Sequence, residues 1–239
     1  MSYEHQQTLP VSQAQVSAIF TAAMQRVYLW MALGLVLTAS VAFYVANSFT
    51  LLSLIFSSQW TFLGLVLVEL GLVIGITRAI NRLSPTAAVG LFLLYAAVNG
   101  VTLSAIFLVY DLGSVALTFG TTAVVFGIMS FVGWTTKQDL SKWGGILFMA
   151  LIGLIVASVA NYFLASTALD AIITYAGVLI FLGLTVYDTN KIKLMATAAA
   201  FQGADGTAVS RIGVLGALRL YLDFINLFLF MLRLLGRRR

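Results

Sequence analysis

The chain has 239 residues, of which 61% are hydrophobic and only 9% are charged. A soluble globular domain is about 45–50% apolar and about 25% charged, so this composition excludes both a soluble enzyme core and a disordered chain. The net charge is +5, there is no cysteine, and the single histidine is His5. Disulfides, zinc–thiolate sites, iron–sulfur clusters and histidine metal clusters are therefore excluded, and we expect neither a cofactor nor a nucleic-acid partner.

Seven mostly apolar runs are long enough to span a membrane, since a spanning helix needs about 20 such residues. They cover 27–47, 60–78, 86–108, 113–134, 144–165, 171–190 and 217–235. The alternation that is typical of a membrane β-barrel is absent. The sequence therefore predicts an all-α polytopic membrane protein. Its expected parts are a polar N-terminal tail over 1–25, with a short surface helix from 13, and a seven-helix membrane domain over 26–239, with one long connection over 191–216.

Basic residues lie on one side of this predicted topology. The tail and the second, fourth and sixth loops carry Arg26, Arg78, Arg82, Lys137, Lys142, Lys191, Lys193 and Arg211. The other three loops carry only Asp111 and Asp170, so the positive-inside rule predicts a cytoplasmic N-terminus. The last segment carries Arg233 and three terminal arginines, which seven spans would place outside. A re-entrant last helix with a cytoplasmic C-terminus is the alternative, although late charges bias topology less than early ones.

Three acidic residues, Glu69, Asp188 and Asp223, lie within apolar runs. On insertion scales, each would cost roughly 2.5–3.5 kcal/mol at the bilayer centre without a partner. We therefore expect them to face the protein interior or water, to find partners, or to hold a proton. Glu69 lies about 13.5 Å from Arg78 along its helix and is the deepest of the three.

Asp188 and Asp223 are predicted to lie at similar depths on consecutive helices. Asp188 falls about 4.5 Å before Lys191, in the last turn of its predicted helix, where the helix dipole disfavours a carboxylate. If Arg219 marks the start of the last helix, Asp223 lies about 6 Å inside it. If that helix instead starts near Gly213, Asp223 lies about 15 Å inside and the match fails.

Two carboxylates that meet in a desolvated place cannot both ionise easily, so they titrate as a unit. Once both protons are lost, the pair offers the oxygen ligands that calcium prefers. Arg219 and Asn226 share a helix face with Asp223. Simpler structural interpretations remain open. In these interpretations, Asp188 pairs with Lys191 or Lys193, and Arg219 neutralises Asp223. Glu69 is then a protonated or hydrogen-bonded packing residue. The aromatic residues have only packing roles; they are Tyr187, Tyr221 and Phe224.

Two runs of the sequence carry a specific resemblance. They are Gly183-Leu-Thr-Val-Tyr-Asp188-Thr-Asn-Lys-Ile-Lys193 and Ala217-Leu-Arg-Leu-Tyr-Leu-Asp223-Phe-Ile-Asn-Leu-Phe-Leu229. With these runs the chain resembles the bacterial branch of the Bax inhibitor-1 family (transmembrane Bax inhibitor motif proteins) from about residue 20 onward. The resemblance implies a central last helix wrapped by two three-helix layers. It also implies a pH-sensitive calcium leak channel in the bacterial inner membrane, with Asp188 and Asp223 as the gating pair.

The resemblance also implies roles for other residues and for the ion. Glu69 would be the family's second-helix acid, which lines the pore or supports the latch, and calcium would be transported or transiently held by the two aspartates rather than being a cofactor. Arg78 and Arg82 are candidates for a supporting base, but the ungapped position is Ile80. Arg219 departs from the family pattern, and with Asn226 it completes the predicted supporting set.

Two other functional classes share features with this sequence. A di-aspartyl intramembrane protease needs Gly-x-Gly-Asp and a later Pro-Ala-Leu motif, whereas Asp223 follows Leu-Tyr-Leu and no proline follows Pro85, so we expect no enzymatic activity. The alternative function is a regulatory membrane protein. The resemblance implies that such a protein would bind and modulate a membrane-anchored ATP-dependent protease or cell-death and stress machinery, with residues 1–25 as the docking element.

Overall fold

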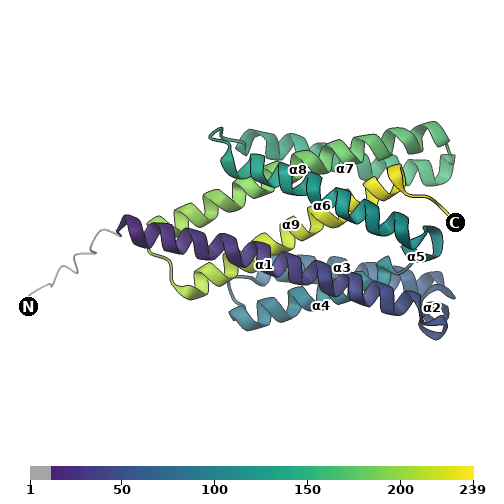
Figure 1. The fold of residues 1–239 in the computed structure, drawn as a ribbon, viewed down its shortest axis with the longest axis horizontal. Helices are drawn as coiled ribbons and strands as arrows, with labels where there is room; N and C mark the ends of the chain where they lie inside the picture. Colours follow the sequence, from purple (N-terminus) through teal and green to yellow (C-terminus); the bar gives the residue numbers. More distant parts are fainter. Residues whose placement is uncertain (1–11) are drawn as a thin grey trace, which may run out of the picture.

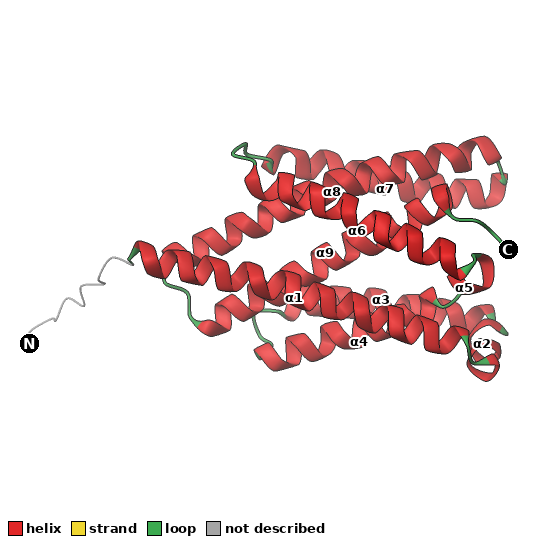
Figure 2. Cartoon of the chain, viewed as in Figure 1, coloured by secondary structure: helices red, strands yellow, loops and turns green. Residues whose placement is uncertain are grey.

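The structure, a computed structural model, describes residues 12–239 and contains helices but no strands over that range (Figure 2). The helices are α1 (Gln13–Ala46), α2 (Phe49–Phe56), α3 (Gln59–Ala79), α4 (Pro85–Leu103), α5 (Ile106–Val109), α6 (Leu112–Thr135), α7 (Ser141–Leu164), α8 (Thr167–Phe201) and α9 (Gly206–Leu235). Within the described range, seven stretches are long and apolar enough to cross a membrane, with α4 and α5 counted together. The predicted all-α, seven-helix class is therefore confirmed.

Short polar residues start most of these helices. The first backbone N–H groups of a helix have no partner within it, and a serine or aspartate side chain can accept a hydrogen bond from one of them. Side chains accept such bonds at Ser12, Ser48, Ser58, Ser84, Asp111, Ser166 and Asp205. These caps allow long apolar helices to be joined by short turns.

The last helix, α9, is the central element of the bundle. Figure 1 shows it, in yellow, running between α6, α7 and α8 on one side and α1, α3 and α4 on the other. In the most apolar 18-residue stretch of α9, 67% of the residues are buried; the corresponding value is 6% for α3 and for α7. Small residues permit this close packing. A Cβ on Gly216 would meet Val27 of α1 at 2.7 Å and Ile192 of α8 at 3.2 Å.

Three helices are longer than the sequence predicted. Helix α1 begins at Gln13 and is continuous with the first spanning stretch, so 13–25 do not form a separate surface helix; most of their side chains are exposed, and Ala23 and Met24 are buried. The expected connection over 191–216 is also wrong. Helix α8 continues to Phe201 and α9 begins at Gly206, because an amphipathic stripe of Ile192, Ala196 and Ala200 is fully buried there. The first eleven residues of the predicted tail lie outside the described range.

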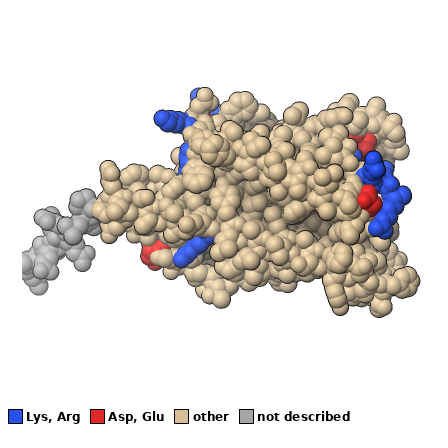
Figure 3. Space-filling model, in the orientation of Figure 1, with Lys and Arg blue, Asp and Glu red and all other residues tan. Residues whose placement is uncertain are grey.

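The C-terminal residues lie at the opposite end of the bundle from the start of α1 (Figure 1). Arg237 O accepts a hydrogen bond from Asp111 N at 3.3 Å, and Arg239 N donates to Val109 O at 2.9 Å. Arg233 also forms an ion pair with Asp170, next to the α7–α8 turn. Figure 3 shows charged side chains gathered at the two ends and a largely uncharged middle. The geometry is that of seven complete crossings and differs from the re-entrant alternative.

This arrangement predicts that reporters fused to the two termini lie on opposite sides of the membrane. With the basic loops in the cytoplasm, alkaline phosphatase fused after Arg239 should be active, and green fluorescent protein at the same position should be dark. The same two reporters fused before residue 12 should give the reverse pattern. Identical patterns at the two ends would contradict the seven-span topology.

Candidate functional site

A cavity of about 520 Å³ lies between α7, α8 and α9 and contains three charged side chains. Asp188 comes from α8, and Arg219 and Asp223 come from successive turns of α9. Most other lining residues are apolar, among them Leu154 and Phe181. The structure therefore brings the two predicted aspartates to one site, surrounded by side chains that do not solvate charge.

Arg219 joins the two helices across this cavity. Its Nη1 donates to Asp188 Oδ1 at 3.2 Å. The side chains of Arg219 and Asp188 are 29% and 14% exposed. Asp223 is only 5% exposed, and its Oδ2 has no hydrogen-bond partner in the structure. The arginine thus forms its ion pair with the neighbouring helix rather than with the aspartate one turn along its own helix.

The two lysines near Asp188 have other partners. Lys193 Nζ donates to Trp134 O at 2.8 Å and to Thr136 O at 2.7 Å, at the end of α6. Lys191 Nζ lies 5.5 Å from the centre of the Tyr187 ring. Neither lysine therefore makes the ion pair with Asp188 that a purely interfacial role would need, although Lys191 is close enough to act on it through space.

The depths of the two aspartates match for a reason that the sequence did not reveal. Asp188 lies about 20 Å before the end of α8 at Phe201, not in its last turn. Asp223 lies about 26 Å after the start of α9 at Gly206. Because α8 and α9 both continue beyond the level where α6 ends, toward a shared turn, the depths still match although α9 starts early. Lys193 marks the level where α6 ends, so Asp188 lies about 7.5 Å inside that level.

The other predicted supporting residues differ in their positions. Asn226 lines the same cavity, and its Nδ2 donates to Leu222 O at 2.8 Å. Arg78 and Arg82 are exposed around the end of α3 and do not line the cavity. The structure therefore does not bring them to the two aspartates, and a supporting role for them stays a prediction. Arg219 supplies the cation instead, while Ile80, at the ungapped position, is buried.

Glu69 belongs to a separate polar network. Its carboxylate accepts hydrogen bonds from Thr102 Oγ1 at 2.6 Å and from Asn99 Nδ2 at 3.3 Å. Asn99 Oδ1 accepts from the Tyr221 hydroxyl at 3.0 Å, and that hydroxyl lies 2.6 Å from Thr38 Oγ1. The network joins α3, α4, α9 and α1, so Glu69 holds the peripheral α3 rather than lining the cavity of the aspartates. The signal in the sequence was Asn99, an amide within an apolar run.

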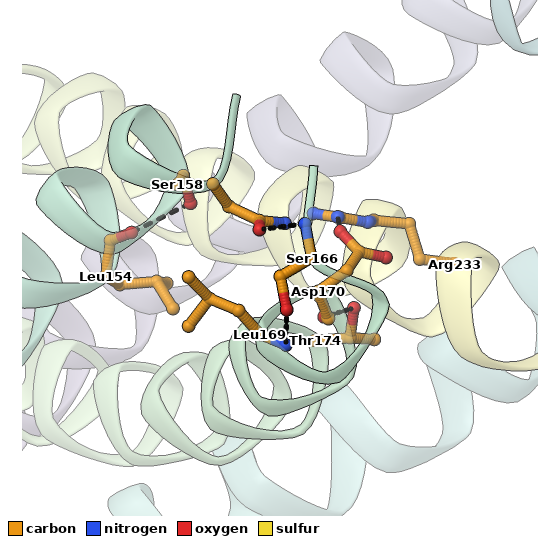
Figure 4. A network of polar contacts seen from close by, with 8 residues as sticks. Leu154, Ser158, Ser166, Leu169, Asp170, Thr174 and Arg233 are labelled. Atoms are coloured by element: carbon orange, nitrogen blue, oxygen red, sulfur yellow. Dashed lines mark hydrogen bonds and ion pairs between the residues drawn. The ribbon is translucent and has the colours of Figure 1, made fainter. Parts of the chain in front are cut away.

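A second ion pair, between Asp170 and Arg233, lies at the far end of α9 (Figure 4). Thr174 Oγ1 donates to the backbone oxygen of Asp170 at 2.8 Å, and Ser166 Oγ accepts from Leu169 N at 3.3 Å at the start of α8. The ion pair ties the last turn of α9 to the first turn of α8, while the two hydrogen bonds stabilise the start of α8 itself. The predicted seven-span topology has both charged residues on this side of the membrane, but their pairing was not predicted.

The donor set of the cavity limits how calcium can interact with it. Calcium takes six to eight oxygen ligands, and the described residues contain no group of three or more acidic, histidine or cysteine side chains suited to a metal ion. Asp188 and Asp223 supply carboxylate oxygens and Asn226 supplies an amide. Such a set provides fewer protein ligands than a calcium ion takes, so a calcium ion held here would keep part of its water shell.

These features define a polytopic α-helical membrane protein with a charged cavity against its central last helix. A family model described as "Inhibitor of apoptosis-promoting Bax1" matches residues 21–239. The inner membrane protein YbhL of Escherichia coli K12 is 49% identical over 216 residues, which are 90% of this chain and 92% of YbhL. The chain therefore belongs to the Bax inhibitor-1 family, as the resemblance indicated, and is an integral inner membrane protein.

Other relatives match over a similar length. A protein of Borreliella burgdorferi is 44% identical over 217 residues, which cover 90% of this chain and 92% of the relative. A protein of Deinococcus radiodurans is 41% identical over 211 residues, 88% of each chain. The family model, which matches residues 21–239, includes the two helices that carry Asp188 and Asp223.

Proposed function

We propose that this protein is a pH-sensitive cation leak channel that admits calcium and is gated by Asp188 and Asp223. The observation that carries this proposal is that two carboxylates and only one guanidinium, that of Arg219, line the same mostly apolar cavity, and that this guanidinium pairs with Asp188 alone. Structural ion pairs are usually balanced, since an uncompensated buried charge is strongly destabilising. An unbalanced site within a membrane bundle is a functional candidate by default.

The charge of this site depends on protons and cations. With both carboxylates ionised, Asp188, Asp223 and Arg219 together carry a net charge of −1. One proton on either carboxylate brings the net charge to zero, and a passing cation also compensates it. Protons and calcium therefore compete for the same oxygens, so the affinity of the cavity for calcium should fall as the pH falls.

The same three residues connect this charge to the packing of two helices. The Arg219–Asp188 pair fastens α9 to α8, while Asp223, on the same helix as Arg219, competes for the guanidinium. A change in the number of protons on the two aspartates therefore changes the strength of the Arg219–Asp188 ion pair. We propose that the cytoplasmic end of the pore, on the side of the basic loops, closes when this ion pair forms and opens when it breaks.

Ion flux in liposomes tests this function directly. The purified full-length chain should be reconstituted into vesicles that contain a calcium dye, and calcium entry should be followed between pH 5 and pH 8. We expect entry above that of protein-free vesicles, with a rate that changes with pH and with calcium binding that weakens at acidic pH. Entry equal to that of empty vesicles at every pH would rule out the leak function.

A regulatory role is the second candidate, and one surface feature favours it. The first turns of α1 and the last turns of α8 share a surface pocket of about 330 Å³, lined by residues that include Phe20 and the exposed Phe201. We propose that a membrane-anchored ATP-dependent protease or a component of the stress or cell-death machinery docks here. Co-purification of the partner with this chain should be lost on Phe201→Asp while calcium entry stays unchanged, and that result would favour the regulatory role. If the partner still co-purifies with Phe201→Asp, the result contradicts this docking site.

A further inference from the structure

A second large cavity, of about 480 Å³, lies between α1 and α6 on the other side of α9. Its walls are Tyr28, Met31, Ala32 and Leu35 of α1, Phe119, Ala123, Phe126, Gly127, Ser130, Phe131 and Trp134 of α6, and Phe224 of α9. Helices α1 and α6 each pack against α8 and α9 but hardly against one another. Because both helices span the membrane, the cavity is accessible from the lipid phase.

One end of this cavity is polar and lies beside cations. The Tyr28 hydroxyl and Ser130 Oγ are 2.6 Å apart, and Ser130 Oγ lies 3.1 Å from Thr189 Oγ1. Tyr28 and Ser130 line the cavity, and two hydrogen bonds among three hydroxyls use two of the three hydroxyl hydrogens; when the third belongs to Tyr28 or Ser130, it can be donated to an ester carbonyl. At the same end, Lys193 holds the backbone oxygen of Trp134, and the exposed Lys137 follows a few residues later.

The rest of the cavity is apolar and elongated. The rings of Phe119 and Phe126 pack edge-on against Phe224, with centroid distances of 5.1 Å and 5.4 Å. From Trp134 to Phe119 the α6 wall runs about 22 Å. One leaflet contributes about 15 Å of the hydrocarbon core. This shape fits a single extended chain better than a compact ligand, and the aromatic residues at its polar end suit the level of lipid headgroups.

We propose that this cavity binds one acyl chain of an anionic glycerophospholipid from the leaflet that faces the basic loops. The ester region would lie at Tyr28 and Ser130, and the phosphate would lie near Lys137 and Lys193. The chain would extend along α6 to Phe119 and would contact Phe224, the residue that follows Asp223. Lipid binding at this cavity does not require ion conduction, so an experiment that contradicts one of the two proposals leaves the other unaffected.

The test fills the cavity without disturbing the packing around it. Gly127 lines the cavity, and a Cβ added there meets no other atom within 4 Å, so Gly127→Leu should fold. Gly153→Leu makes the same change at an equally open position on α7, away from the cavity. Each protein should be purified in mild detergent with 1-palmitoyl-2-oleoyl-phosphatidylglycerol and weighed intact by native mass spectrometry. We expect one retained lipid in the original chain and in Gly153→Leu, and at least tenfold less retention in Gly127→Leu.

A photoactivatable phosphatidylglycerol with a diazirine on its acyl chain locates the site independently of folding effects. In the original chain we expect cross-links concentrated on 119–134 and 28–35. Cross-links spread evenly over the equally lipid-exposed α3 and α7, or retention unchanged by Gly127→Leu, would overturn the proposal. If Gly127→Leu elutes as an aggregate, Ala123→Leu fills the same cavity and replaces it in the comparison. Equal retention of phosphatidylcholine would overturn the assigned headgroup preference.

Discussion

Replacing Asp223 with asparagine is expected to remove the pH dependence of calcium entry and to weaken calcium binding at pH 8 by at least tenfold. Asparagine keeps the size of the side chain, but the site then holds only Asp188 and Arg219, which balance each other. A neutral site has no excess charge for a proton or a cation to compensate. At an effective dielectric constant near 20, the interaction energy that calcium loses with one unit of charge exceeds 1.4 kcal/mol, and 1.4 kcal/mol corresponds to a factor of ten in the dissociation constant.

The control for this variant is Asp139→Asn, which removes a carboxylate from the exposed turn between α6 and α7. Its net charge equals that of Asp223→Asn, so general effects of charge on vesicles or dye cancel. Calcium entry should be measured at five or more pH values for both variants, together with their thermal unfolding midpoints. A pH profile of Asp223→Asn that superimposes on that of Asp139→Asn would remove Asp223 from the gate.

Arg219→Gln is expected to have the second large effect. It should strengthen calcium binding, whereas Asp223→Asn should weaken it. Without the guanidinium, the two carboxylates carry a charge of −2 when ionised, so calcium should bind more tightly and should raise the thermal unfolding midpoint more than in the original chain. Breaking a buried pair costs about 3–5 kcal/mol. Because Arg219 is partly exposed, we expect a cost of about 1–3 kcal/mol in calcium-free buffer at pH 8.

A double variant separates charge balance from simple loss of contacts. Arg219→Gln combined with Asp188→Asn returns the net charge to −1 and should recover most of the lost stability, while the ion pair itself stays absent. Arg78→Gln, at an exposed arginine outside the cavity, is the matched single control. If the double variant is no more stable than Arg219→Gln alone, the effect of the arginine is not electrostatic.

The sequence predicted the helical elements well where hydropathy alone determines them. All seven spanning stretches were found, because each is a continuous apolar run bounded by polar turns. The ends of α8 and α9 were missed, since residues 191–216 mix alanine and glycine with charged residues and have low hydropathy. Burial of Ile192 and Ala196 against neighbouring helices stabilises that part of α8, and such tertiary burial is not visible in a hydropathy profile.

The sequence predicted the two aspartates and Arg219 as members of the candidate site, but not which aspartate Arg219 pairs with. Carboxylates in apolar runs are conspicuous, and the family resemblance drew attention to Asp188 and Asp223. The partner of Asp188 was not predictable, because Arg219 lies on the same helix face as Asp223 and the sequence favoured a pair within that helix. Which of two nearby carboxylates an arginine reaches depends on the rotation of α8 against α9, and this is set by packing rather than by spacing.

The central position of α9 has a consequence for how this protein is made. The thirty residues of α9 are synthesised after those of α1 to α8, so the surrounding helices must enter the bilayer before the helix around which they pack is available. During that interval Asp188, Asn99 and Thr38 lack the partners that α9 brings, namely Arg219 and Tyr221. Nascent chains truncated before residue 206 should therefore be substrates for membrane quality control, whereas loss of the three terminal arginines alone should be tolerated.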